Sequence, residues 1–163
     1  MVRAPRPVAR ALERALTQRR WARSPLALYD LGLGGLLGRS LLRVEHRGRT
    51  TGQPRYVVLE VVDRPRPGVI RVVSGLGRQA QWFRNIQADP RVRVTNGWGG
   101  PVPATAHVLD RTEAAATFAR YQAVHPVRWS ALERTVRGRV APGHELADDL
   151  PVIDLVLDGP EAA

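Results

Sequence analysis

The sequence contains no cysteine in its 163 residues. This absence excludes disulfide bonds, thiolate metal sites and cysteine nucleophiles, and it fits a reducing compartment. Long apolar runs are also missing, since residues 26–37 fall short of the roughly 20 residues that span a membrane and include Asp30. The basic N-terminus lacks the apolar segment and small-residue cleavage site of a secretory signal. We therefore expect a cytoplasmic protein.

Three kinds of catalytic or cofactor site lack their sequence signature. The four histidines, His46, His107, His125 and His144, are scattered without metal-ligand spacing, and no cysteine could complete a site. No G-x-S-x-G elbow indicates a serine hydrolase. No G-x-G-x-x-G follows the first expected strand, so a dinucleotide-binding fold is disfavoured. We therefore predict no metal site and no Rossmann domain.

Lysine is absent as well, so arginine alone supplies the 25 Lys and Arg positions and the net charge of +10. Such an excess of positive charge attracts polyanions: nucleic acid, anionic lipid or an acidic small molecule. The arginines are spread along the chain, aromatic residues make up 6% of it, and no nucleic-acid recognition motif is present. We therefore expect a small-molecule ligand and no specific nucleic-acid partner.

The first 39 residues differ in pattern from the rest of the chain. Residues 7–21 predict a basic amphipathic helix whose apolar stripe is thin. Basic amphipathic helices can contact membrane surfaces, but the thin stripe makes such contact weak and favours packing on the domain or on a partner subunit. A second short helix is expected over 24–37. We divide the chain into an N-terminal helical segment, 1–39, and one domain, 40–163.

From residue 40 onward the pattern predicts short strands and a few helices. Six runs rich in β-branched residues are expected as strands, at 41–45, 55–62, 69–74, 92–95, 102–109 and 152–157. Helices are expected at 79–88, at 110–125 with Asp110 and Glu113 as reciprocal caps, and at 129–136. The short connections favour a predominantly antiparallel sheet closed or half-closed into a barrel. The fold class is therefore α+β, a barrel with flanking helices.

One polar segment, residues 46–55, joins the first two expected strands and contains three arginines, two threonines and two glycines. Gly48 and Gly52 allow positive φ and a close approach of the backbone to a bound group. Backbone N–H, hydroxyl and guanidinium donors can together bind a phosphate or a carboxylate. The same residues could instead form a solvated hairpin tip.

A second glycine-rich segment, residues 74–78, ends the third expected strand and leads into a short helix. On that helix Trp82 and Asn85 lie three residues apart and so share a face. Because a helix N-terminus attracts anions, residues 75–78 could assist in holding a phosphate or carboxylate. We predict that the two segments converge on one site. The alternative for Trp82 is a core residue.

Together the two segments resemble the deazaflavin-dependent nitroreductase family. Residues 48–55 match its pattern G-R-x-[ST]-G-x-x-R, and residues 82–90 match W-x-x-N-L-x-A-x-P with Ile86 in place of the leucine. A strand ending in Ser74 separates the motifs, and a valine-rich strand follows them. The resemblance implies a split β-barrel, similar to flavin-reductase-like barrels, that binds the deazaflavin coenzyme F420 and acts as an oxidoreductase. Split barrels of this kind often pair, so a homodimer is also implied.

The resemblance implies roles for individual residues. The coenzyme's tail and ring would contact Arg49, Thr50, Thr51, Arg55, Val57, Val58, Leu59, Glu60, Val73, Ser74, Gly75, Trp82 and Asn85. A hydride would pass from reduced F420 to an electron-poor acceptor, namely an enone, a quinone or a nitroaromatic. Ser74 is predicted to orient the ring or the substrate oxygen, and His125 or Tyr121 to supply a proton. Alternatively, the Ser74 hydroxyl bonds to backbone and His125 stabilises a helix C-terminus.

Two positions depart from the family pattern. Thr50 and Gly75 stand where some members have lysine, so two positive contacts to the coenzyme tail are missing unless Arg47 or Arg78 replaces them. FMN is an alternative cofactor, because the loop suits its phosphate equally well. The two missing lysines motivate a third hypothesis, a non-catalytic protein of the same fold that binds an acidic or apolar ligand.

Overall fold

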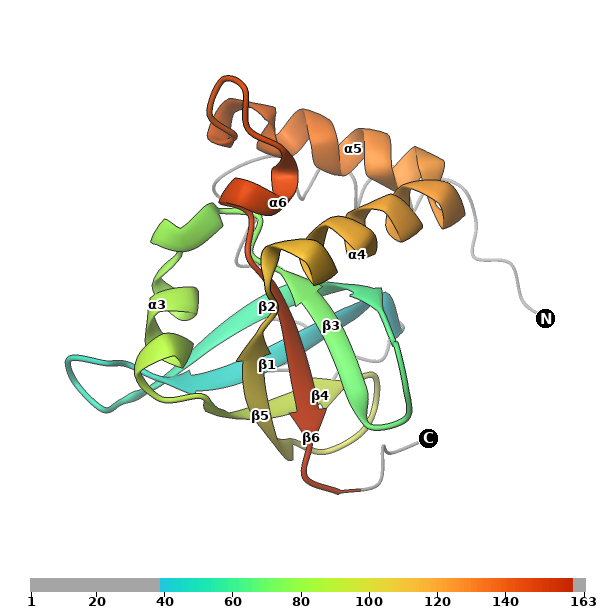
Figure 1. Cartoon of the computed structure of the whole chain (residues 1–163). Helices are drawn as coiled ribbons and strands as arrows, with labels where there is room; N and C mark the ends of the chain where they lie inside the picture. Colours follow the sequence, from blue (N-terminus) through green and yellow to red (C-terminus); the bar gives the residue numbers. More distant parts are fainter. Residues whose placement is uncertain (1–38, 160–163) are drawn as a thin grey trace, which may run out of the picture.

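Six antiparallel strands close into a barrel in the computed structural model, which describes residues 39–159 (Figure 1). Around the barrel the strands are hydrogen-bonded in the order β1, β2, β3, β6, β5 and β4. Their bounds are β1 Leu41–Arg47, β2 Pro54–Asp63, β3 Val69–Val73, β4 Arg91–Asn96, β5 Val102–Val108 and β6 Val152–Leu157. The predicted α+β split β-barrel is confirmed.

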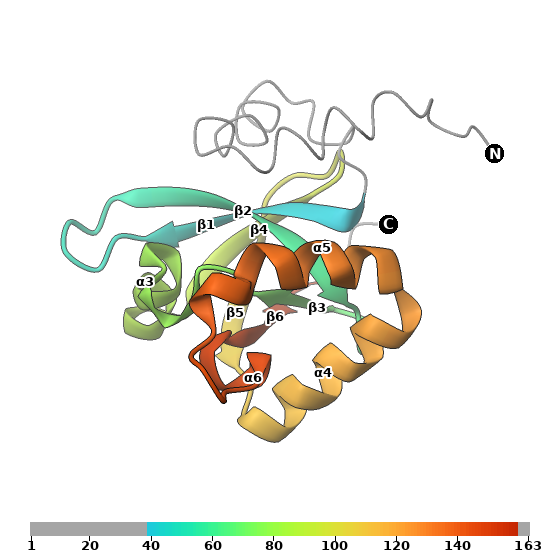
Figure 2. The same cartoon turned by 90° about the horizontal axis from the view of Figure 1, so that it is seen from above.

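Short helices flank the barrel on two sides (Figure 2). Their bounds are η2 Gly77–Gln79, α3 Gln81–Ala88, α4 Arg111–Val124, α5 Pro126–Val136, η3 Arg137–Arg139 and α6 Leu146–Asp149, where η marks a 3₁₀ helix. α3 packs against β1 and β2, whereas α4, α5 and α6 gather over another part of the barrel. Within residues 39–159, no helix combines the length and apolar character needed to cross a membrane.

Alternating apolar side chains fill the barrel. In β1 the buried residues are Leu42, Val44 and His46, and those between them are partly exposed. Phe83 of α3 joins this core. β3 is buried at every position because the helices cover its outer face. A second apolar cluster lies under those helices and contains Val73, Ala114, Phe118, Val136, Ala147, Leu150 and Val152.

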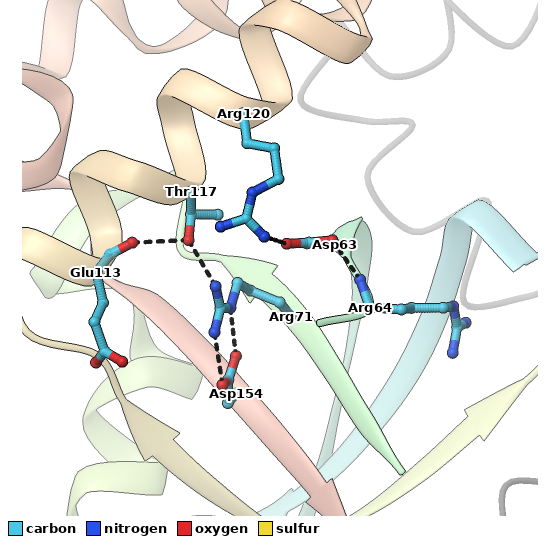
Figure 3. A network of polar contacts seen from close by, with 7 residues as sticks. All are labelled: Asp63, Arg64, Arg71, Glu113, Thr117, Arg120 and Asp154. Carbon is cyan, nitrogen blue, oxygen red and sulfur yellow. Dashed lines mark hydrogen bonds and ion pairs between the residues drawn. The ribbon is translucent and has the colours of Figure 1, made fainter. Parts of the chain in front are cut away.

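A buried ion pair fixes α4 on the outer face of the barrel (Figure 3). Arg71 of β3 donates two hydrogen bonds to Asp154 of β6, from Nε to Oδ1 at 2.6 Å and from Nη2 to Oδ2 at 2.9 Å. Its Nη1 donates to Thr117 Oγ1 of α4 at 2.8 Å. The hydrogen bonds to Asp154 raise the pKa of Arg71. A buried charge is tolerated when it is paired in this way.

The same helix makes a second polar contact with the barrel at Arg120. Its Nη1 donates to Asp63 Oδ2 at 2.8 Å, while Asp63 Oδ1 accepts from the Arg64 N–H at 2.8 Å (Figure 3). The Arg120 side chain is half exposed, so this ion pair contributes less than the buried one. α4 is therefore held on the barrel from both β2 and β3.

The observed strand boundaries agree with the predicted ones to within two residues, whereas two of the predicted helices begin at a different residue. The helix expected at 79–88 begins at Gln81, because a separate 3₁₀ turn precedes it. Asp110 caps α4, and its carboxylate accepts from the Glu113 N–H at 2.9 Å. The helix expected at 129–136 begins at Pro126, since proline fits the first turn of a helix. The helices expected at 7–21 and 24–37 lie outside the described residues.

Candidate functional site

The loop between β1 and β2 is a tight turn closed by backbone hydrogen bonds. The Gly52 N–H donates to the Gly48 carbonyl at 2.7 Å, and the Gly48 N–H donates to the Gln53 carbonyl at 2.8 Å. Gly52 has a φ of 66°, which glycine adopts without strain. At Gly48 an added Cβ would lie 3.0 Å from Thr51 Oγ1, so a side chain would displace that hydroxyl. The loop's own backbone hydrogen bonds therefore define its shape.

Arg49 joins this loop to α3. Its backbone N–H donates to Asn85 Oδ1 at 3.2 Å, and its Nη1 donates to Asn85 Oδ1 at 2.9 Å and to Gln81 Oε1 at 3.0 Å. Gln81 and Asn85 lie one helical turn apart, so both amide oxygens face the loop. The structure thus brings two of the predicted site residues, Arg49 and Asn85, into direct contact.

Asn85 is buried and also contacts β1. Its Nδ2 lies 3.1 Å from Nδ1 of His46, and both side chains are about 5% exposed or less. Burial lowers the pKa of His46; a hydrogen bond with the Arg47 backbone opposes this shift, and the positive charge of Arg55 adds to it. Asn85 therefore connects the exposed loop with a histidine that is held neutral beneath it.

The remaining loop donors are exposed to solvent. Thr50, Thr51 and Arg55 are exposed, as is Arg49 itself. Arg55 pairs with His46 across β1 and β2, so its side chain lies on the strand face that carries His46. Guanidinium and hydroxyl groups are hydrogen-bond donors that suit phosphate and carboxylate oxygens. The loop therefore concentrates donors and positive charge near α3.

The predicted contacts in β2 divide between two faces of the strand. Leu59 is buried in the barrel core and Val57 packs against that core. Glu60 faces outward and accepts a hydrogen bond from α4, and Val62 packs in the cluster under the helices. Because side chains alternate along a strand, Val58 also faces outward. Val58 and Glu60 are thus the predicted β2 residues whose side chains could contact a ligand outside the barrel. Val57 and Leu59 pack in or against the barrel core.

Ser74 holds the turn that follows β3. Its side chain is fully buried, and its hydroxyl donates to the Gly77 carbonyl at 2.8 Å. The Gly77 N–H donates in return to the Ser74 carbonyl at 2.8 Å. Gly75 is partly exposed next to Val136 of α5, and Val73 belongs to the cluster under the helices. The Ser74 hydroxyl thus bonds to backbone and closes this turn.

Trp82 belongs to the barrel core. It is 7% exposed and packs edge-on against Phe83, with ring centroids 6.2 Å apart. Asn85, three residues along the same helix, is also buried but turns its amide toward the loop. Trp82 thus fixes α3 on the barrel, and Asn85 presents the polar group.

Tyr121 and His125 form a separate pair at the end of α4. The Tyr121 hydroxyl donates to Glu60 Oε1 at 2.8 Å, and its ring lies 5.2 Å from the His125 ring. Burial, followed by the hydrogen bond to Glu60, strongly raises the pKa of Tyr121, and the charge of Arg128 opposes this shift. Tyr121 therefore stays protonated at neutral pH. The two candidate proton donors therefore lie next to each other. Ser74 makes its hydrogen bonds elsewhere, in the turn that follows β3.

A cleft of about 560 Å³ opens between α4, α5 and the segment before α6. The rings of Phe118 and Trp129, 6.0 Å apart, contribute its aromatic surface. Its volume falls in the range of small-molecule pockets, but its lining includes none of the residues predicted for the coenzyme. In the part of the chain that the structure describes, no group of three or more histidine, cysteine or acidic residues could hold a metal ion.

Two polar residues at the loop were missed by sequence reasoning. Gln81 accepts a hydrogen bond from Arg49, and His46 lies behind Asn85. A signal for His46 was available, because the alternation of Leu42, Val44 and His46 puts this histidine on the buried face of β1. A polar residue on a buried face requires a partner. Gln81 had no such signal, since it begins a helix at an exposed position.

Comparisons with solved structures support the fold. A structure described as an F420-H2 dependent reductase (FDR-A) is 21% identical over 72% of this chain and 94% of that chain, with a TM-score of 0.51. A chain described as a domain-swapped dimer is 21% identical over 83% and 97%, with a TM-score of 0.52. A Listeria innocua protein provisionally described as a pyridoxamine 5'-phosphate oxidase is 12% identical over 81% and 94%, with a TM-score of 0.51. At such identities the likeness shows a shared fold.

Comparison at the level of families gives the classification. No curated protein sequence matches the chain significantly. The family model described as F420H(2)-dependent quinone reductase matches residues 30–140, a span that includes the loop, α3 and the helix pair α4 and α5. The resemblance seen in the sequence to a deazaflavin-dependent family is thereby confirmed. The chain belongs to the F420H(2)-dependent quinone reductase family.

Proposed function

We propose that this protein transfers a hydride from reduced coenzyme F420 to an electron-poor acceptor, which is a quinone, an enone or a nitroaromatic. Family membership supports the reductant and the reductase activity. The observation that carries the proposal is the arginine-rich loop docked on α3 through Arg49, Asn85 and Gln81. A preformed loop with exposed cationic donors suits an anionic coenzyme tail.

The donor set fits such a tail. Arg49 and Arg55 would bind phosphate or carboxylate oxygens, and Thr50 and Thr51 would add hydroxyl donors. Apart from Gly52 and its two chain neighbours, no residue has an atom within 4 Å of the position that a Cβ would take at Gly52, so a ligand can approach the loop backbone there. Asn85 would hold the loop rather than the ring, because its amide oxygen already accepts two bonds from Arg49. The same donors suit the phosphate of FMN.

When bound, reduced F420 supplies the hydride. The outward side chains Val58 and Glu60 of β2 would flank its ring, with Gly75 at the ring edge. Trp82 would support this wall from the core. Ser74 would act through the turn that carries Gly75, because its buried hydroxyl donates to the Gly77 carbonyl and so fixes the shape of that turn. The barrel and the helices would exclude water from the ring.

Proton supply is assigned to the pair at the end of α4. Tyr121 holds its proton tightly, because burial and Glu60 raise its pKa. A group whose pKa lies far above the working pH is a weak general acid. His125 is half-buried next to Tyr121, and histidine is the side chain that most often acts as a general acid or base in enzymes. We therefore assign the proton transfer to His125, and we assign to Tyr121 the positioning of the His125 ring, because its own hydroxyl proton is donated to Glu60.

Turnover with a panel of acceptors tests this proposal. Purified protein is mixed with reduced F420 and, in turn, with a quinone, an enone and a nitroaromatic, and the fluorescence of the oxidised coenzyme is followed. We expect acceptor-dependent oxidation that saturates with acceptor. Binding of F420 without turnover on any acceptor would instead indicate a non-catalytic ligand-binding protein. If denaturation of the purified protein releases FMN, the cofactor is FMN and not F420.

A homodimer is proposed as the assembly. A structural relative of the same fold is described as a domain-swapped dimer, and this relation motivates the proposal. Light scattering of the full chain gives its mass in solution. A mass of about twice 18.0 kDa is expected, and a mass of 18.0 kDa would contradict the dimer.

A further inference from the structure

We propose that neutral His46 is a positioning residue for the anion-binding loop, because it fixes the Asn85 amide that holds Arg49. His46 lies on β1 beneath the loop and is 4% exposed. It does not touch the exposed face where a ligand would bind, so it would act through Asn85. This inference rests on the proposed function only in the step that links loop position to coenzyme affinity.

The orientation of the Asn85 amide follows from its partners. The Arg49 N–H and the Arg49 guanidinium are both pure donors, and both lie within hydrogen-bond distance of one end of the amide, at 3.2 and 2.9 Å. That end must therefore be the oxygen. The other end, at 3.1 Å from His46 Nδ1, must be the NH2 group, which can only donate.

The orientation of Asn85 in turn fixes the state of His46. A ring nitrogen that accepts from an NH2 group carries no proton, so Nδ1 is bare and the neutral ring carries its proton on Nε2. Protonation at Nδ1 would bring two donors face to face at this distance. Rotation of Asn85 to remove that conflict would break both of its bonds to Arg49. The neutral imidazole is thus required for the loop to stay docked on α3.

The charges around His46 favour this neutral state. Arg55 lies opposite it in β2, Arg47 and Glu45 flank it in β1, Arg93 of β4 pairs with Glu45, and Arg49 stands beyond Asn85. α3 presents the neutral side chains Asn85 and Gln81 to this region. Burial lowers the pKa of His46, and the positive charge of Arg55 acts in the same direction. Acidification is therefore needed to protonate His46 and to undock the loop.

Two substitutions separate positioning from simple structural support. In His46→Gln the side-chain oxygen can accept from Asn85 Nδ2 but does not titrate. In His46→Phe the ring fills a similar space but offers no acceptor. We expect F420 affinity in the wild type to fall by about tenfold as the pH is lowered through the midpoint of the His46 ring, which the ring's own resonances report. We expect His46→Gln to bind with near wild-type affinity and a flatter pH profile, and His46→Phe to bind about tenfold more weakly throughout.

The loop itself provides a readout without coenzyme. In nuclear magnetic resonance spectra of the free protein, the Arg49 backbone N–H and the Asn85 side-chain NH2 should shift with the same midpoint as the His46 ring, and should not shift in His46→Gln. Independent midpoints, or the same profile in the wild type and in His46→Gln, would overturn the inference. If the free protein behaves as expected but F420 binds at no pH, the proposed function fails and the positioning role of His46 stands. If F420 binds with unchanged affinity in His46→Phe, the positioning role fails alone.

Discussion

Arg71 and Arg49 each connect separate elements of this molecule and differ in almost every other respect. Arg71 joins β3, β6 and α4, is buried, and meets a carboxylate through two parallel hydrogen bonds. Arg49 joins the first loop to α3, is exposed, and meets the neutral amide oxygens of Gln81 and Asn85. Charge is balanced at the first site, whereas it remains available at the second.

This difference separates a structural arginine from a ligand-binding one. A buried guanidinium paired with Asp154 cannot leave without stranding a charge in the protein interior. The exposed Arg49 guanidinium meets neutral oxygens through Nη1, so its charge and its Nε and Nη2 donors can serve an anion while the loop stays docked on α3. The contacts of Arg49 therefore preorganise the loop without neutralising its charge.

The largest effect is expected for Arg71→Met. Removal of one partner of a buried ion pair leaves Asp154 charged and unpaired, which costs about 3–5 kcal/mol of unfolding free energy. Chemical denaturation measures this loss. The double variant Arg71→Met with Asp154→Leu should recover most of it, because both charges are then gone. A loss below about 1 kcal/mol in the single variant would show that the pair is not a structural centre.

A smaller effect, on binding instead of folding, is expected for Arg49→Ala combined with Arg55→Ala. Two charge-assisted hydrogen bonds of about 1.5–3 kcal/mol each are lost, so F420 affinity should fall at least about 100-fold. The free energy of unfolding should change by about 0.5 kcal/mol. Arg66→Ala is the matched control, since Arg66 is also exposed but lies at the other end of β2. An equal loss of affinity in this control would show that the effect arises from the net charge of the protein and not from the loop.

Tyr121→Phe should have a moderate effect on stability. The change removes the hydrogen bond to Glu60 but keeps the ring, which costs about 1 kcal/mol. Thermal or chemical unfolding measures this cost. Tyr56→Phe serves as control, because Tyr56 is 44% exposed and should tolerate the change. Equal stability of both variants would mean that Tyr121 does not fasten α4 to β2.

The smallest effect is a pH dependence of stability from His46. Its pKa is lowered in the folded protein, so between that value and the unfolded value near 6.5 the unfolded chain binds more protons. Stability should therefore rise with pH through this window and fall as pH decreases, with a slope of at most about 1.4 kcal/mol per pH unit. Unfolding measured at several pH values should give a flatter curve for His46→Gln. A wild-type curve that matches the variant would exclude this contribution.

The acidic groups that act at lower pH are distinct from His46. Hydrogen bonds with Arg91 and with Arg111 lower the pKa of Asp89 and Asp148, respectively. Such carboxylates stabilise the fold above their unfolded pKa, near 3.9, and lose that effect as the pH falls further. Their window therefore begins at a lower pH than that of His46, and the upper part of the His46 window can be measured without their contribution.

Much of the fold could be predicted from local pattern. The six runs rich in β-branched residues predict the six strands of the barrel. They do so because strand propensity and the alternation of apolar side chains are set by residues close in sequence. The contact between the first loop and α3 was predicted as a convergence of two motifs. Pro126 misled the helix prediction, since a proline can either end a helix or begin the next one.

The rest of the candidate site depends on contacts between residues far apart in the sequence. In the sequence Arg71 is a polar residue within a predicted strand. Its partner Asp154 lies 83 positions away, so the sequence gives no sign of the ion pair. Which face of β2 is open to a ligand depends on α4, which covers Glu60 and its neighbours. The buried state of Ser74 also follows from a turn whose closure with Gly77 involves no recognisable motif. Such pairings arise only when the barrel closes.

Titration of the purified protein with oxidised F420 tests the central claim most directly. The claim is that the exposed loop at Arg49 binds the anionic part of the coenzyme. Saturable quenching of the coenzyme's fluorescence is expected for the wild type, with much weaker quenching for Arg49→Ala combined with Arg55→Ala. An absence of binding to the wild type at tens of micromolar, or equal binding by the double variant, would contradict the claim.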